Sequence, residues 1–336
     1  DNDQIDPPRG IARRTSPTNI GFGLLAALAA RDFGYIGTGK MAALIDQTLS
    51  TVELLPKWNG HLQNWYDTTT LFPLSPGYVS TVDSGNFVGY LIALRQGLKE
   101  YLESPLVDTR LVNGVEDTLY CAGADGVMLE RNFALRSVIT AQGNVDMRLW
   151  NQRIAEMQDD GRLAALYDSV WREKARRMLS QFSDELTLYL PGSRLIRIFP
   201  DAPAEALSAS DRAAVHAIVA MLAENPSLCE LPRQHGRIAS HIDQLMRNIH
   251  QGGDGWPLAL TEWLTQTKAD LLDARENATR LVTLVTGLMS RLDTLSNATD
   301  FRPLYVKKRQ LLSIGFSLDE NKLTNSYYDL LASEAR

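Results

Sequence analysis

The sequence contains little cysteine or histidine, which argues against a metal centre or a disulfide framework. Its 336 residues include 2 cysteines, Cys121 and Cys229, and 5 histidines, of which His241 and His250 are nine residues apart. None of these spacings matches a set of metal ligands. We therefore expect no metal and two free thiols in a reducing compartment, with a single disulfide as the alternative.

The chain also has no excess of positive charge and no long apolar run. A formal net charge of −6 argues against binding to nucleic acid, which needs a basic surface. The longest uncharged apolar run, residues 20–30, is far shorter than the roughly 20 residues that span a bilayer, and we expect no signal peptide. With 44% hydrophobic and 22% charged residues, the composition is typical of a globular chain.

The chain is predicted to begin with a linker and then to form helices. Residues 1–14, DNDQIDPPRGIARR, contain two prolines and a glycine and are expected to be extended. Ser16 is placed to cap a helix whose first residue is Pro17. The stretch of this helix at residues 20–34 is apolar nearly all round, so the helix is expected to be buried on every side. A second, amphipathic helix is expected over residues 41–55.

The start of the first helix is repeated 67 residues later. Asn19 is followed five residues on by Leu24-Leu25-Ala26, and Asn86 by Leu91-Ile92-Ala93. The offset holds one buried helix, one outer helix and a connecting segment. Helical hairpins repeated in this way build a closed or curved α/α stack, so the pattern favours an all-α toroid.

The rest of the chain is predicted to be helical up to about residue 300 and then to form a hairpin. Residues 264–295 have apolar positions at helical spacing and predict an amphipathic helix with a possible coiled-coil partner. Residues 186–190 fit a short edge strand or a helix end equally well. Residues 301–306 and 311–316 flank a basic turn and predict a β-hairpin, which we expect at a rim where loops gather.

Three segments carry polar and aromatic residues just before a helix that is expected to be buried, at residues 15–19, 65–86 and 327–336. If these helices run in the same direction, their starts gather at one end. Aromatic rings can stack on sugar faces, and carboxylates and amides can hydrogen-bond to hydroxyl groups. Cleavage of a glycosidic bond needs two carboxyl groups, one as the acid and one as the nucleophile or base. The candidates are Asp67, Asp83, Asp329 and Glu334.

Each of these candidates also has a purely structural explanation. Asp83 could cap its own helix, and Trp65 and Tyr66 could pack at the rim. Asp329 could pair with Arg309 or another cation of the rim. Glu334, near the start of a helix, could simply complement the helix dipole.

Several long motifs occupy the two ends of the chain: RRTSPTNIG (13–21), AARDFGYIGT (29–38), GHLQNWYDTTTLFPLSPGYVSTVDSGN (60–86), LIALRQGL (91–98) and DFRPLYVKKRQLLSIGFSLDENKLTNSYYDLLASEAR (300–336). Together they resemble cyclic β-1,2-glucan synthases. The match is to the central glycoamylase-like domain, between the glycosyltransferase part and the phosphorylase-like part of those enzymes. Residues 105–295 match only in being helical.

The resemblance implies an (α/α)6-barrel (toroid) fold, which is expected to be incomplete in this chain. Residues 1–14 would then be a linker from a preceding domain. Residues 15–336 would be the first part of the glycoamylase-like domain, with helical insertions at residues 105–295 and a short β-hairpin at the rim.

The resemblance also implies a retaining transglycosylase that cuts linear β-1,2-glucan and rejoins it into rings. Glu334 of the SEAR motif is the implied general acid/base, with Ser333 as the helix cap before it. The implied nucleophile is a second glutamate in a downstream segment that this chain lacks, so the fragment is expected to be inactive alone. No cofactor and no metal are implied. The implied substrate-binding residues are Trp65, Tyr66, Asp67, Asp83, Asn86, Tyr328 and Asp329.

The implied partners are the β-1,2-glucan chain and the glycosyltransferase and phosphorylase-like domains of the same polypeptide. The implied location is the cytoplasmic side of the bacterial inner membrane, within a multi-pass membrane protein of which this segment is soluble. Two alternatives stay open. One is a β-glucan hydrolase or phosphorylase of related fold, and the other is a non-catalytic sugar-binding or scaffold part of a membrane enzyme.

Overall fold

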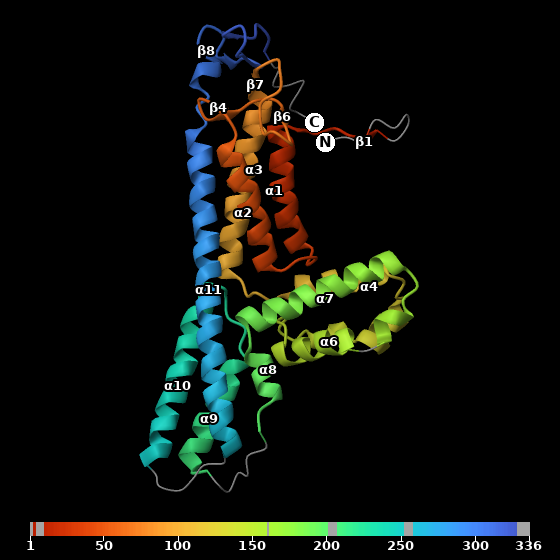
Figure 1. Ribbon diagram of the computed structural model, residues 1–336, viewed down its shortest axis with the longest axis vertical. Coiled ribbons are helices and arrows are strands. Elements are labelled where there is room, and N and C mark those ends of the chain that lie inside the picture. Colours follow the sequence, from red (N-terminus) through yellow and green to blue (C-terminus); the bar gives the residue numbers. More distant parts are fainter. Residues whose placement is uncertain (1–2, 5–9, 160, 201–206, 252–257, 328–336) are drawn as a thin grey trace. The chain divides into compact units, whose positions relative to one another are not determined.

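The structure is a computed structural model that describes residues 3–4, 10–159, 161–200, 207–251 and 258–327 (Figure 1). Most of these residues lie in helices, as the all-α prediction requires, and the strands are short. The chain divides into two compact units. Unit 1 comprises residues 1–29, 42–99 and 286–336, and unit 2 comprises residues 30–41 and 100–285.

Unit 1 is built on α1 (Pro17–Asp32), α2 (Thr38–Leu54), α3 (Thr81–Glu103) and the C-terminal part of α11 (Leu258–Ala298), which lie side by side (Figure 1). Ion pairs join α11 to its neighbours: Arg291 pairs with Asp46 and Glu53 of α2, and Arg95 of α3 pairs with Asp293. The bounds of α1 and α2 confirm the helices predicted at residues 20–34 and 41–55. The core of the unit is made of buried aliphatic side chains, among them Leu24, Ile45, Leu49, Leu91, Leu94, Leu98, Leu288 and Leu292.

Glycines allow α1 and α3 to approach each other closely. A Cβ atom added at Gly21 would lie 2.2 Å from the ring of Tyr90, and one added at Gly97 would lie 2.6 Å from Leu28. The rings of Phe22 and Tyr90 are 4.9 Å apart. The two helices that the repeat predicts therefore pack directly against each other in unit 1. The complete toroid stays a prediction.

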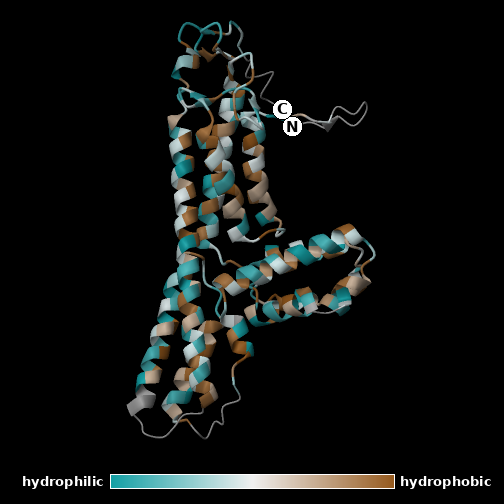
Figure 2. Cartoon of the chain, in the orientation of Figure 1, coloured by the Kyte–Doolittle hydropathy of each residue, from teal (hydrophilic) through white to brown (hydrophobic). Residues whose placement is uncertain are grey.

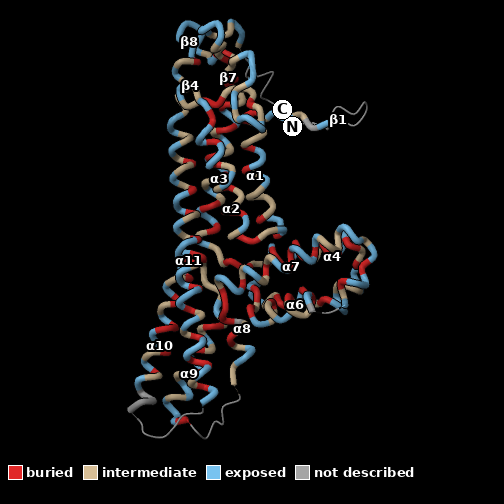
Figure 3. Tube along the Cα trace, viewed as in Figure 1, coloured by how far each residue is buried: buried red, intermediate tan, exposed pale blue. Residues whose placement is uncertain are grey.

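One face of α1 is open to solvent. Phe22 is 56% exposed, Gly23 and Ala26 are exposed, and Ile92 of α3 is 59% exposed. Figure 2 shows the apolar character of α1, and Figure 3 shows how little of it is buried. The prediction that this helix is buried on every side is wrong for the described part of the chain. An apolar pattern shows that a face can be buried, but burial needs a partner element, and the described residues supply none there.

The strands of unit 1 are short and pair antiparallel. β3 (Arg14–Thr15) pairs with β6 (Tyr66–Asp67), and β4 (Lys57–Trp58) pairs with β5 (His61–Leu62). β10 (Gly315–Ser317) lies between β11 (Lys322–Leu323) and β7 (Tyr78–Ser80) in a three-stranded sheet. β8 (Tyr305–Val306) pairs with β9 (Leu311–Leu312) after a short 3-10 turn (Arg302–Leu304), which confirms the predicted hairpin. In the expected linker, β1 (Asp3–Gln4) pairs with β2 (Gly10–Ile11).

Unit 2 is almost wholly helical in its described residues. Its helices are α4 (Thr109–Cys121), α5 (Gly126–Met128), α6 (Met147–Asp159), α7 (Ser169–Tyr189), α8 (Gly192–Arg197), α9 (Ala209–Leu222), α10 (Leu231–Gln251) and the N-terminal part of α11. A π-helical turn (Leu129–Phe133) and two 3-10 turns (Leu135–Val138 and Gly161–Ala165) connect them. Residues 186–190 form the C-terminal end of α7, so the helix end is right and the strand is wrong.

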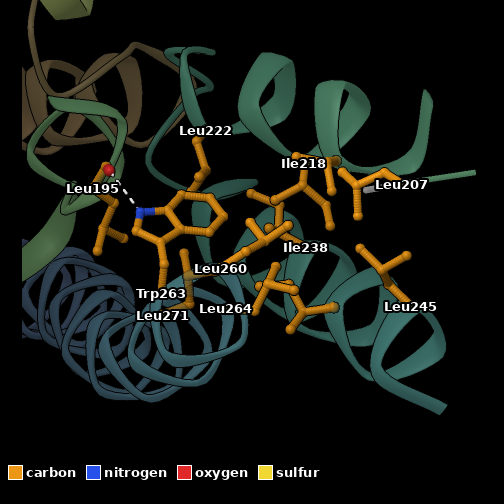
Figure 4. Packing of buried hydrophobic residues seen from close by; sticks show 12 residues of the cluster. Leu195, Leu207, Ile218, Leu222, Ile238, Leu245, Leu260, Trp263, Leu264 and Leu271 are labelled. Atoms are coloured by element: carbon orange, nitrogen blue, oxygen red, sulfur yellow. Dashed lines mark hydrogen bonds between the residues drawn. The ribbon is translucent and has the colours of Figure 1, made fainter. Parts of the chain in front are cut away.

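The core of α8, α9, α10 and α11 is a single apolar cluster (Figure 4). Trp263 of α11 is its largest member, and its indole Nε1 donates a hydrogen bond of 2.9 Å to the carbonyl of Leu195. The helix predicted at residues 264–295 is confirmed as part of α11: its Leu264 and Leu271 belong to this cluster, whereas Leu288 and Leu292 lie in the core of unit 1. The expected boundaries of the insertion, residues 105–295, stay a prediction.

Candidate functional site

The N-terminal ends of α1 and α3 are each capped by a serine. Ser16 Oγ accepts a hydrogen bond from the backbone N–H of Asn19 at 3.2 Å, which confirms the predicted cap. Ser80 Oγ accepts from the N–H of Asp83, also at 3.2 Å. Ser80 is therefore the cap of α3, and the alternative that Asp83 caps its own helix is wrong. The carboxylate of Asp83 lies in the first turn, where it also suits the helix dipole.

A side-chain hydrogen bond joins the two helix starts. Thr18 Oγ1 donates to Asp83 Oδ1 at 2.5 Å, although the two residues are 65 positions apart. The predicted gathering of helix starts at one end is confirmed for these two segments. Asn86 lies exposed on α3, three residues beyond Asp83.

Asp83 is also linked to Trp65 through Asn64. With its amide in the orientation that satisfies both groups, Asn64 donates to Asp83 Oδ2 at 3.3 Å and accepts from Trp65 Nε1 at 3.2 Å. The guanidinium of Arg14 lies 4.6 Å from the centre of the indole. Neutral donors therefore hold Asp83, and the described residues form no ion pair with it. A carboxylate held in this way keeps lone pairs that can accept bonds from sugar hydroxyls.

Tyr66 is buried and its phenol has two partners. The hydroxyl donates to the carbonyl of Pro56 at 2.6 Å and accepts from the N–H of Gln63 at 2.8 Å. Burial raises the pKa of Tyr66 to about 12, so the phenol is neutral. The side chain is 0% exposed and fixes the β6 segment from inside, as the rim-packing alternative proposed.

We expect the substitution Tyr66→Phe to lower the free energy of unfolding of unit 1. It leaves the carbonyl of Pro56 and the N–H of Gln63 without this partner, and the loss of such buried bonds costs about 1–3 kcal/mol. Urea denaturation followed by tryptophan fluorescence measures the change. Tyr305→Phe, at a tyrosine that is 44% exposed, is the control and should have little effect. Equal effects of the two substitutions would contradict a structural role of the Tyr66 hydroxyl.

Asp67 closes a turn. Its Oδ1 accepts from the N–H groups of Thr69 at 2.8 Å and Thr70 at 2.7 Å. These bonds, that from Thr70 first, lower the pKa of Asp67 below its usual range, with help from Arg13. The carboxylate is thus ionised at neutral pH and holds the loop that follows β6.

The segment after residue 300 packs beside Gly77 and Tyr78, because β10 pairs with β7. Tyr78 Oη and Thr324 Oγ1 lie 3.2 Å apart, and Asp319 accepts from the N–H of Gly77 at 3.0 Å. Arg309 lies 4.7 Å from the ring centre of Tyr327. Three predicted site residues lie outside the described residues: Tyr328, Asp329 and Glu334.

Metal ligands and membrane spans can be assessed only for the described residues. Within them, no group of three or more His, Cys, Asp or Glu side chains is placed to hold a metal ion. None of the helices in that part of the chain combines the length and the apolar character that crossing a membrane requires.

Sequence reasoning missed Thr18, Asn64 and Arg14 as members of the site. Thr18 lies in the segment 15–19, and Asn64 lies directly before the segment 65–86, next to Trp65. Their side chains join the site through contacts with residues far away along the chain or through an aromatic face. Local sequence carries no signal for such contacts.

The whole chain was compared with known proteins. No family model matches the chain. The chain is 30% identical, over 337 aligned residues that cover 100% of it, to the cyclic β-(1,2)-glucan synthase NdvB of Rhizobium meliloti (strain 1021). The resemblance to a cyclic β-1,2-glucan synthase is confirmed. The chain spans 10% of the length of NdvB.

The similarity extends through unit 2 as well as unit 1, because it covers the whole chain. The aligned region therefore includes residues 105–295, where the sequence motifs predict no similarity to the synthases beyond helical structure.

Proposed function

We propose that the chain is part of a cyclic β-1,2-glucan synthase and that the end of unit 1 where α1 and α3 begin binds the β-1,2-glucan chain. The observation that carries the proposal is the similarity to NdvB along the whole chain. The hydrogen-bonded set of Thr18, Asp83, Asn64 and Trp65 supports it, since it combines an aromatic ring with acceptors for hydroxyl groups.

In this proposal the reaction is a retaining transglycosylation within an (α/α)6 barrel that residues of a longer polypeptide complete. Glu334 donates its proton to the glycosidic oxygen while a carboxylate outside this chain attacks the anomeric carbon. The deprotonated Glu334 then takes the proton of the sugar hydroxyl that attacks the glycosyl–enzyme bond. One glycosidic bond breaks and one forms, so no water is consumed.

The proposed contacts with substrate come from Trp65, Asp83 and Asn86, and from Tyr328 and Asp329, whereas Asp67 shapes the loop after β6 through its hydrogen bonds to Thr69 and Thr70. Tyr66 acts through the position of its neighbours, because its own side chain is buried. The partners we propose are the glycosyltransferase and phosphorylase-like domains of the same polypeptide, on the cytoplasmic side of the inner membrane. The chain alone is proposed to be inactive.

The test is the substitution Glu334→Gln in the full-length polypeptide. We expect ring formation from linear β-1,2-glucan to fall at least about a hundredfold, because the amide cannot transfer the proton. Mass spectrometry measures it, since a ring weighs one water less than the linear chain with the same number of glucose units. Glu320→Gln, at an exposed glutamate that pairs with Lys322, is the control and should form rings at the normal rate.

The other outcomes separate the alternatives. Shorter linear products without rings from the unaltered enzyme would indicate a hydrolase. Release of sugar phosphates only when phosphate is added would indicate a phosphorylase. Normal ring formation by the Glu334→Gln enzyme would show that Glu334 is not the acid/base.

A further inference from the structure

The loop that follows β6, residues 68–77, folds back on the end of that strand, and we call it the β6 loop (Figure 1). The N–H of Asp67 donates to the carbonyl of Phe72 at 2.9 Å, and the N–H of Leu74 donates to the carbonyl of Trp65 at 2.9 Å. An antiparallel bridge joins Tyr66 and Pro73 between these two bonds. Phe72 therefore lies opposite Asp67, and Leu74 lies opposite Trp65.

The pairing puts four side chains on one face. In an antiparallel pair, successive side chains point to opposite faces, and residues opposite each other share a face. Tyr66 points into unit 1, where it is 0% exposed. The face opposite Tyr66 is thus shared by Trp65, Asp67, Phe72 and Leu74.

Phe72 is the most exposed member of this face. It is 68% exposed, and Leu74 beside it is 37% exposed. Hydrogen bonds fix the backbone at Phe72: the Asp67 carboxylate closes the turn before it, and the Phe72 N–H donates to Thr70 Oγ1 at 3.4 Å. Leu71, just before it, has φ of +64°, a left-handed conformation that side chains other than glycine adopt at a cost. The loop thus adopts an unfavourable backbone conformation at Leu71 and leaves the apolar ring of Phe72 exposed to water.

We propose that Phe72 is a further substrate-contacting residue, which packs with Leu74 against the C–H face of a glucose unit in the β-1,2-glucan chain. Asp67 is then a positioning residue that shapes the loop. The inference rests on the proposed function. A glucose unit has an apolar face and a rim of hydroxyl groups, and the loop matches both.

The polar groups around the ring favour a sugar over a protein partner. The apolar area is only two side chains wide, and four hydroxyl-bearing residues of the same loop, Thr68, Thr69, Thr70 and Ser75, are exposed. Asp83 is connected to this face as well, because Asn64 hydrogen-bonds both to its carboxylate and to the indole of Trp65. Small apolar patches with a few placed polar groups are typical of small-molecule sites, whereas protein interfaces need larger ones.

The test is Phe72→Ala in the full-length polypeptide, with linear β-1,2-glucan as the added substrate. We expect KM to rise about tenfold with kcat almost unchanged, because the ring contributes equally to binding of the ground state and the transition state. Phe72→Trp should restore KM. Tyr120→Ala, at an aromatic residue of unit 2 that is 67% exposed, is the matched control and should leave KM unchanged.

Asp67→Ala adds a second measurement. If Asp67 acts through the loop, Asp67→Ala raises KM, and adding it to Phe72→Ala raises KM no further. Independent, additive effects would show that Asp67 contacts the glucan itself and would remove its positioning role.

Three results would overturn the inference. A KM within twofold of normal in Phe72→Ala, in an enzyme that forms rings, would defeat it and leave the proposed function intact. No action of the unaltered enzyme on linear β-1,2-glucan would defeat both. An unchanged KM together with a change of oligomeric state, measured by light scattering, would make the face an interface between protein chains.

Discussion

Replacement of Arg31 by Met is expected to lower the free energy of unfolding of unit 2 by about 3–5 kcal/mol, since a buried charge pair loses one partner. Arg31 is 0% exposed. Its guanidinium donates to Thr38 Oγ1 at 3.0 Å, to the carbonyl of Leu106 at 3.1 Å and to both carboxylate oxygens of Asp108. It also lies 4.7 Å from the ring centre of Tyr101.

The cost is large because Arg31 serves several elements of unit 2 at once. Asp108 is the N-cap of α4 and accepts from the N–H groups of Arg110 and Leu111. Without the guanidinium, the Asp108 carboxylate loses a bidentate partner at a position where its side chain is only 20% exposed. The carbonyl of Leu106 loses a partner as well, and methionine offers no donor to replace it.

The measurement is the urea midpoint of the transition reported by the buried tryptophans of unit 2, Trp150 and Trp263. Arg302→Met is the matched control, because that arginine pairs with Asp300 but its side chain is 91% exposed. It should leave the midpoint almost unchanged. A loss below about 1 kcal/mol for Arg31→Met would show that the site relaxes or that water replaces the guanidinium.

The stability of unit 2 is expected to fall by about 3 kcal/mol between pH 6.5 and pH 4 because of His235. This residue of α10 is 4% exposed, and its Nδ1 is buried without a partner among the described residues. Burial lowers the pKa of His235 from 6.5 to about 4. Below pH 6.5 His235 binds a proton in the unfolded chain but stays neutral in the folded chain. Falling pH therefore favours unfolding until it reaches the pKa of His235 in the folded protein.

The substitution His235→Phe should flatten this part of the pH profile. The side chain then has no proton to take up in the unfolded state, and the unpartnered nitrogen is gone. His216→Phe, at an exposed histidine of α9, is the control and should leave the slope as it was. Glu224, which lines the same small cavity as His235, is unaltered in both proteins.

The comparison must be made between variant and unaltered protein at each pH. Burial also lowers the pKa of His61 in unit 1, which adds a slope of the same sign. Subtracting the free energy of unfolding of the unaltered protein from that of the variant at each pH cancels the contribution of His61. A pH profile that is identical with and without His235 would show that its ring finds a partner in solution, and would contradict the prediction.

Much of the local structure could be predicted because neighbouring residues decide it. Ser16 caps α1 and Pro17 begins it, as expected, since the bonds involved reach only three residues along the chain. The hairpin of β8 and β9 follows from its two apolar runs and the basic turn between them. The family resemblance was also readable, because its motifs are long and the similarity covers the entire chain.

The errors arose where one pattern allows two outcomes. Ser80 and Asp83 can both cap α3, and the structure selects Ser80 because its backbone stands just outside the first turn. The apolar surface of α1 can be buried on all sides, yet Phe22 stays exposed among the described residues. Tyr66 reads as a ring available to sugar, but its side chain turns inward because alternation along β6 sends Trp65 and Asp67 to the other face.

The sequence by itself determined the helices, their starts, the rim hairpin and the kinship with glucan synthases, because these depend on nearby residues or on long unbroken motifs. The tertiary structure alone decided which side chains meet. Thr18 binds Asp83 across 65 residues, and Arg31 binds Asp108 across 77. Such contacts depend on how helices pack, and helix packing depends on the combined shape of many apolar side chains rather than on any one of them.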